Sequence, residues 1–70
     1  MNMTRFGQAV RTHRKALGKS SEQIARCAGV GRSTVTEVET GKHTPRLDVA
    51  ASIAAALGVP LDALIRESCV

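Results

Sequence analysis

The stretch that most constrains the fold of this chain is residues 23–41, QIARCAGVGRSTVTEVETG. An apolar pair at helical spacing lies on either side of a central glycine: Ile24 and Ala25 before it, Val35 and Val38 after it. Gly29 can adopt the positive φ that a tight turn requires, and Val30 follows it as an apolar plug. The spacing therefore predicts two short helices that bury one face each and are joined by a glycine turn.

This arrangement is a helix-turn-helix, a motif whose second helix can present polar side chains away from the core. The stretch resembles the XRE-type (phage-repressor-like) helix-turn-helix family, and the resemblance extends over about residues 5–65. Ala25 matches the small residue that is usual at the corresponding position of that family. The resemblance implies a lambda-repressor-like DNA-binding domain that is compact and all-α.

The remaining chain supports a five-helix bundle in one domain, residues 1–70, with its core at about 5–66 and the helix-turn-helix at about 21–39. Helices are predicted at about residues 5–17, 21–28, 32–39, 46–57 and 61–67. Thr4 is the expected N-cap of the first helix, and Ser20 with Gln23 forms an S-x-x-Q capping box before the second.

Two apolar stripes are expected to face the core. In the first helix they are Phe6, Ala9, Val10, His13 and Leu17. In the fourth helix they are Leu47, Ala50, Ala51, Ala54 and Leu57, with Ile53 at the edge. Because Phe6 is the only aromatic residue, the core must be aliphatic, and a stacking platform for single-stranded nucleic acid is hard to build.

The composition narrows the possible partners and chemistry. A net charge of +4 favours a polyanionic partner. No signal peptide and no apolar run near membrane-spanning length is visible, so we expect a cytoplasmic protein without a membrane partner. Neither the cysteines (Cys27, Cys69) nor the histidines (His13, His43) have metal-ligand spacing, and no catalytic constellation can be assembled. We therefore expect no metal, no cofactor and no enzymatic activity, with Cys27 a small buried thiol rather than a redox switch.

The second helix of the motif supplies the candidate base-contacting residues. Opposite its two valines lie four polar residues: Arg32, Ser33, Thr36 and Glu37. Arg32 can donate two hydrogen bonds to guanine, Glu37 can accept from cytosine N4, and Thr36 can offer a methyl or a hydroxyl. The alternative is that these residues form only a solvated face.

Contacts to DNA phosphates are expected from two segments. Ser21 follows the cap of the first motif helix, where its backbone amide and hydroxyl can hold a phosphate. A basic loop follows the second motif helix, with candidate residues Lys42, His43, Thr44 and Arg46. The family commonly has Gln at the position of Ser21 and a small cap residue at that of Arg46, so the phosphate contact of Ser21 is shorter and Arg46 adds charge.

Arg14 and Glu39 are expected to form a structural ion pair. Arg14 lies four residues after Val10, and Glu39 lies four residues after Val35, so each occupies the inner edge of its helix. The resemblance strengthens this expectation, because similar Arg and Glu positions pair in the family. The alternative is two ordinary surface charges.

A homodimer is expected because one such domain reads only a few base pairs, whereas two half-sites about 34 Å apart multiply the affinity. The last helix is the candidate interface, through Val59, Leu61, Leu64 and Ile65. Small members of the family often pair through this region. The alternative is that these side chains only cap the bundle.

The function that follows is a sequence-specific regulator of transcription, more often a repressor, that binds a pseudo-palindromic operator in double-stranded DNA. Controller proteins of restriction–modification systems are a further possibility within this class. Two other interpretations stay open: an antitoxin that also binds a toxin, and a protein-interaction module that does not bind DNA. Arg32 and the basic loop argue against the second, and Glu37 supports it.

Overall fold

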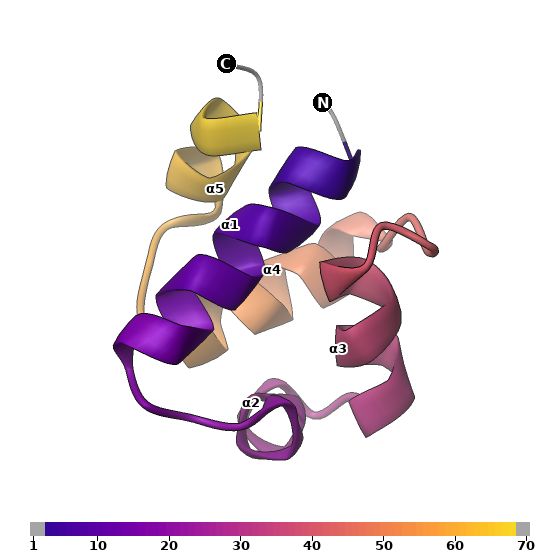
Figure 1. Cartoon of the computed structure of the whole chain (residues 1–70), viewed down its shortest axis with the longest axis vertical. Helices are drawn as coiled ribbons and strands as arrows, with labels where there is room; N and C mark the ends of the chain where they lie inside the picture. Colours follow the sequence, from indigo (N-terminus) through magenta and orange to yellow (C-terminus); the bar gives the residue numbers. More distant parts are fainter. Residues whose placement is uncertain (1–2, 69–70) are drawn as a thin grey trace.

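Residues 3–68 of the chain, as described by a computed structural model, form an arrangement of α-helices joined by short loops (Figure 1). The helices are α1 (Met3–Ala16), α2 (Ser21–Ala28), α3 (Arg32–Glu39), α4 (Leu47–Leu57) and α5 (Leu61–Ser68). α1 packs against α3, α4 and α5, while α2 packs against α3 and α4. No strand occurs within these residues, so the all-α, five-helix prediction is confirmed.

The first helix differs from its prediction at both ends. It begins at Met3, so Thr4 lies inside the helix and is not its N-cap. It ends at Ala16 because the chain turns at Gly18, whose φ is +70°. Leu17 therefore lies beyond the helix with 48% of its surface exposed, and its predicted place in the core is wrong.

The turn between α2 and α3 follows the predicted chemistry. The Ser20 hydroxyl accepts a hydrogen bond from the Gln23 amide at 3.1 Å, and the Gln23 side chain accepts one from the Ser20 amide at 2.8 Å. These reciprocal bonds satisfy amides that the first turn of a helix leaves unpaired. Gly29 ends α2 with a φ of +72°, and Val30 then packs partly buried against the core.

The core is aliphatic around one aromatic ring, as predicted. Its fully buried apolar side chains come from every helix: Phe6, Val10, Ile24, Val35, Val38, Ile53 and Leu64. Both predicted apolar pairs of the helix-turn-helix lie in this cluster, so the two helices share one core with the rest of the chain. The orientation of α3 is consequently fixed by packing on α1 and α2.

The buried face of α4 is rotated from the predicted one. Ile53, expected at the edge, is fully buried, whereas Leu47 is 73% exposed and Ala51 is also exposed. The buried residues Ala50, Ile53, Ala54 and Leu57 form an i, i+3, i+4, i+7 stripe. Leu47 and Ala51 belong to a neighbouring stripe that is equally apolar in sequence, so periodicity alone could not choose between them.

α4 is also the most apolar helix of the chain, with Asp48 its only charged residue. Within residues 3–68, no single helix has both the length and the apolar character to cross a membrane. α4 and α5 meet that criterion only when they are taken together, and they are bent by 105° at the break between them.

A close approach between α1 and α3 depends on Gly7. This glycine is buried, and a Cβ atom placed on it would collide with the carbonyl oxygens of Val38 and Glu39. The gap to the Glu39 oxygen would be only 2.7 Å. α1 therefore touches the last turn of α3 backbone against backbone, a contact that apolar periodicity did not predict.

Candidate nucleic-acid interface

α3 presents all four predicted base-contacting residues to solvent. Arg32, Ser33, Thr36 and Glu37 are exposed, while Val35 and Val38 on the opposite side have no exposed surface. The helix begins after Gly31, which offers no side-chain cap, so the polar residues start in its first turn. That is the end of a recognition helix that reads base edges.

The side chains on this face offer different hydrogen-bonding chemistry. Arg32 carries only donors, and Glu37 carries only acceptors when ionised. The Thr36 hydroxyl donates to the carbonyl oxygen of Arg32 at 3.2 Å, within α3. Its hydrogen is thereby used, and what Thr36 presents outward is a methyl group and an acceptor oxygen.

Ser21 is the first residue of α2 and is half-buried. Because the Ser20 hydroxyl accepts from Gln23, the Ser21 amide lies at the positive end of the helix dipole ahead of the capped amide. Glu22 follows it in the same turn and pairs with Arg26 at 3.2 Å on the exposed surface. An anion at Ser21 therefore approaches close to a carboxylate that is partly neutralised.

The predicted basic loop follows α3 directly. Gly41 has a φ of +75°, and the Lys42 amide donates to the Glu37 carbonyl at 3.0 Å, which closes the helix. The candidate phosphate-contacting residues of this loop are all exposed: Lys42, His43, Thr44 and Arg46. Pro45 between them is buried, so the loop is anchored to the domain at one point and extends its charges outward.

The ion pair between Arg14 and Glu39 is present and part-buried. The Arg14 Nε donates to Glu39 Oε2 at 2.9 Å, and its second terminal nitrogen donates to Oε1 at 3.0 Å. The remaining terminal nitrogen donates to the Lys19 carbonyl at 2.9 Å. Only 14% of the Arg14 side chain and 8% of that of Glu39 are exposed. One guanidinium thus joins α1, the C-terminal turn of α3 and the loop that precedes α2.

The candidate dimer residues on and before α5 lie against the domain itself. Leu64 has no exposed surface, so its predicted place in an interface is wrong: its side chain fills the core. Val59 and Leu61 are half-buried and pack on the same core, and Ile65 is half-buried. The capping alternative therefore accounts for Leu64, and the exposed side of α5 is instead charged, through Asp62, Arg66 and Glu67.

Cys27 is exposed, and the prediction of a buried thiol is wrong. α2 buries Ile24 and Ala25 and half-buries Ala28, so the inward stripe passes beside position 27. Cys69 lies outside the described residues. His13 is half-buried, with its Nε2 3.1 Å from a Glu67 oxygen, and His43 is exposed on the loop. Among residues 3–68, no group of His, Cys, Asp or Glu is arranged to hold a metal ion.

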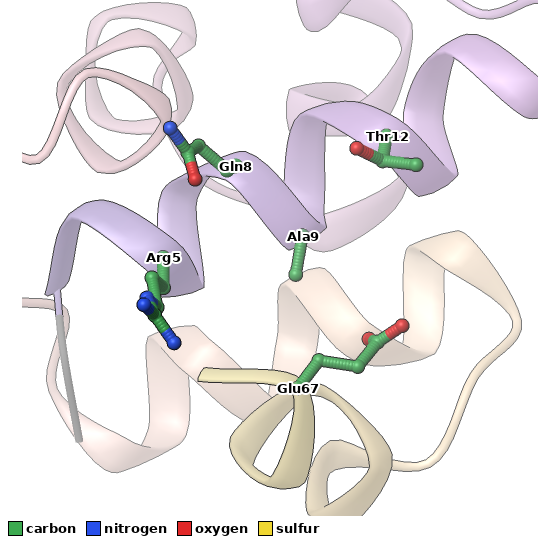
Figure 2. Close-up of a pocket in the computed structure, with 5 residues that line it drawn as sticks. All are labelled: Arg5, Gln8, Ala9, Thr12 and Glu67. Carbon is green, nitrogen blue, oxygen red and sulfur yellow. The ribbon is translucent and has the colours of Figure 1, made fainter. Parts of the chain in front are cut away.

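An open hollow of about 470 Å³ lies between α1 and α5. Figure 2 shows its lining, which comes from Arg5, Gln8, Ala9, Thr12 and Glu67. None of the candidate DNA-contacting residues lines this hollow. Its lining mixes one apolar methyl with charged and amide groups, and sequence reasoning did not identify it.

Comparison with known proteins agrees with this geometry. A family model described as a helix-turn-helix domain matches residues 5–67. An uncharacterized HTH-type transcriptional regulator of Methanothermobacter thermautotrophicus is 45% identical over 49 residues, which is 70% of this chain and 71% of the relative. The transcriptional repressor RstR of the cryptic phage CTXphi in Vibrio cholerae is 30% identical over 63 residues, 90% of this chain and 57% of that protein.

Solved structures show the same fold. The restriction–modification controller protein C.AhdI from Aeromonas hydrophila superposes with a TM-score of 0.86 and 35% identity, over 89% of this chain and 94% of that one. The clp gene regulator ClgR from Corynebacterium glutamicum gives 0.89 at 23% identity, over 99% and 90% of the two chains. The predicted resemblance and the absence of an enzymatic role both agree with these relatives, all of which are named as regulators of transcription or as a controller protein. The chain belongs to the helix-turn-helix family of XRE-type transcriptional regulators.

Proposed function

We propose that this protein binds double-stranded DNA sequence-specifically, as a homodimer on a pseudo-palindromic operator, and represses transcription there. In this proposal α3 enters the major groove with Arg32, Ser33, Thr36 and Glu37 against base edges. The observation that carries it is the exposure of all four side chains on a helix whose opposite face is fully buried.

The framework of α3 suits such a role, because base readout requires a helix held in one orientation. The three hydrogen bonds of Arg14 tie the end of α3 to α1 and to the loop before α2. Gly7 lets α1 touch the same turn of α3 through its backbone. Rigid support of this kind reduces the entropy that would be lost when the helix docks on DNA.

Phosphate contacts come from either side of α3 in this proposal. Ser21 offers the N-terminus of α2, and the loop offers Lys42, His43, Thr44 and Arg46. These contacts fix the register of the domain on DNA without reading sequence. The names of RstR, a repressor, and of C.AhdI, a controller protein, support regulation at an operator.

The base-specific part of the proposal is tested by selection from a random double-stranded DNA library across a salt series, followed by sequencing. We expect a pseudo-palindrome, with affinity that falls steeply as salt rises. Arg32→Ala should relax one base position in each half-site, at a cost of about 1–3 kcal/mol for the preferred base.

Arg66→Ala is the matched control, because Arg66 is an exposed arginine on α5 that pairs only with Asp62 on its own helix. It removes the same charge from the protein and should leave the selected sequence unchanged. Enrichment of no sequence at all would contradict the proposal. Retention of DNA only at low salt would do the same, and would favour the protein-interaction alternative.

A further inference from the structure

An apolar face on α4 is left uncovered. Leu47 is the most exposed large hydrophobic residue of the described chain, at 73%, and Ala51 and Ala55 continue the exposed face at successive i+4 steps. Beside them lies an open hollow of about 560 Å³ lined by Arg46, Leu47, Asp48 and Ala51. The face therefore offers both an apolar side chain and a space next to it.

The charges around Leu47 are arranged in a self-complementary way. Arg46 and Asp48, the residues before and after it, are 85% and 74% exposed, and their charged groups are 3.7 Å apart. In a twofold contact a patch meets a second copy of itself. Arg46 of one copy can then face Asp48 of the other, twice, while each Leu47 enters the hollow beside Ala51 of the partner.

We propose that this face, Leu47 and Ala51 flanked by Arg46 and Asp48, is where two copies of the chain meet. The inference rests on the proposed function only for its use on DNA; the contact itself is a property of the protein. It replaces the predicted interface around α5, where Leu64 is buried and the exposed residues are charged. The small side chains of Ala51 and Ala55 permit close approach of a second helix.

The charge of the neighbouring loop determines when the contact forms. Leu47 follows the basic loop directly, so docking two copies through it brings two sets of Lys42 and Arg46 into proximity. Without DNA these cations repel, and the apolar patch is small, so the dimer in solution is weak. Added salt screens the repulsion and strengthens the dimer, whereas added salt weakens binding to DNA. Opposite salt dependences are the signature of this arrangement.

The first test is sedimentation equilibrium of the full chain, without DNA, at low and high salt. Leu47→Ser should raise the dimer dissociation constant about tenfold or more, because each copy loses its apolar anchor. Leu17→Ser is the matched control: it removes the other exposed large hydrophobic residue, at the end of α1, and should leave the constant unchanged. A thermal melt of both variants should match the wild type, since neither side chain belongs to the core.

The second test is disulfide trapping in a chain whose native cysteines are both replaced (Cys27→Ser, Cys69→Ser). Ala51→Cys should form a covalent dimer on mild oxidation, and Leu17→Cys should not. Equal trapping at the two positions overturns the proposal, as does a Leu47→Ser variant that dimerises like the wild type. Loss of the dimer in Ile65→Ser, with Leu47→Ser unaffected, also overturns it and restores the α5 surface.

These outcomes are separable from those of the DNA experiment. A protein that selects an operator but shows no α4 contact refutes only this inference. Trapping at position 51 in a protein that selects no DNA refutes only the proposed function. If both hold, Leu47→Ser should still bind an isolated half-site and should lose the gain in affinity that a second half-site provides.

Discussion

The guanidinium of Arg14 grips the carboxylate of Glu39 with two hydrogen bonds, of 2.9 and 3.0 Å, across the contact between α1 and α3. Its third bond, to the Lys19 carbonyl, leaves each nitrogen of the fork with a partner. Both side chains are largely withdrawn from solvent. The end of the recognition helix is thereby held by a charge-assisted, bidentate contact, which is among the stronger polar interactions of a protein.

The pair should be essential for stability. Arg14→Ala strands the Glu39 carboxylate in a part-buried site, which costs about 3–5 kcal/mol. A domain of this size has on the order of 5 kcal/mol in total. We expect the variant to be largely unfolded at moderate temperature, as measured by circular dichroism during a thermal melt. Arg66→Ala, which breaks an exposed pair on α5, should melt close to the wild type. A melting temperature for Arg14→Ala within a few degrees of the wild type would refute the claim.

Gly7 should not tolerate a methyl group. Glycine to alanine in an exposed helix interior stabilises by about 1 kcal/mol, but here the added Cβ meets the carbonyl oxygens of Val38 and Glu39. We expect Gly7→Ala to destabilise the domain by about 1–3 kcal/mol, the usual range for overpacking. Urea unfolding measures this, with Gln8→Ala, a change at the exposed neighbouring position, as the control. Unchanged or increased stability in Gly7→Ala would show that the two helices do not approach so closely.

Lys42 should contribute affinity without specificity. Lys42→Ala removes one exposed cation from the loop after α3, so binding should weaken by a similar factor on every DNA sequence. The slope of log affinity against log salt should fall by about 1. Lys15→Ala, an exposed lysine on α1, is the control of equal charge. If both variants change the slope equally, the effect comes from net charge and not from a contact at the loop.

Much of the fold could be predicted because local rules act on neighbouring residues. The capping box of Ser20 and Gln23 and the glycine turn at Gly29 involve groups only a few positions apart. The inward pairs of α2 and α3 were predicted for a similar reason, since each helix has polar residues on its other side. The residues of the base-contacting face followed from those pairs by helical geometry alone.

Errors arose where several faces of a helix were equally apolar or where two backbones meet. α4 has apolar side chains almost all round, so only its packing against α1, α2 and α5 decided that Ile53 is buried and Leu47 exposed. Cys27 lies at the edge of its helix's buried stripe and came out exposed.

The sequence by itself thus determined the helices, their turns, the Arg14–Glu39 pair and the polar face of α3, because each depends on short-range spacing and on charge. Only the tertiary structure decided which side of α4 stays uncovered, that Leu64 belongs to the core, and that Gly7 is a contact point. These features depend on the rotation of each helix and the distance between helices, which the packing of all five helices sets jointly.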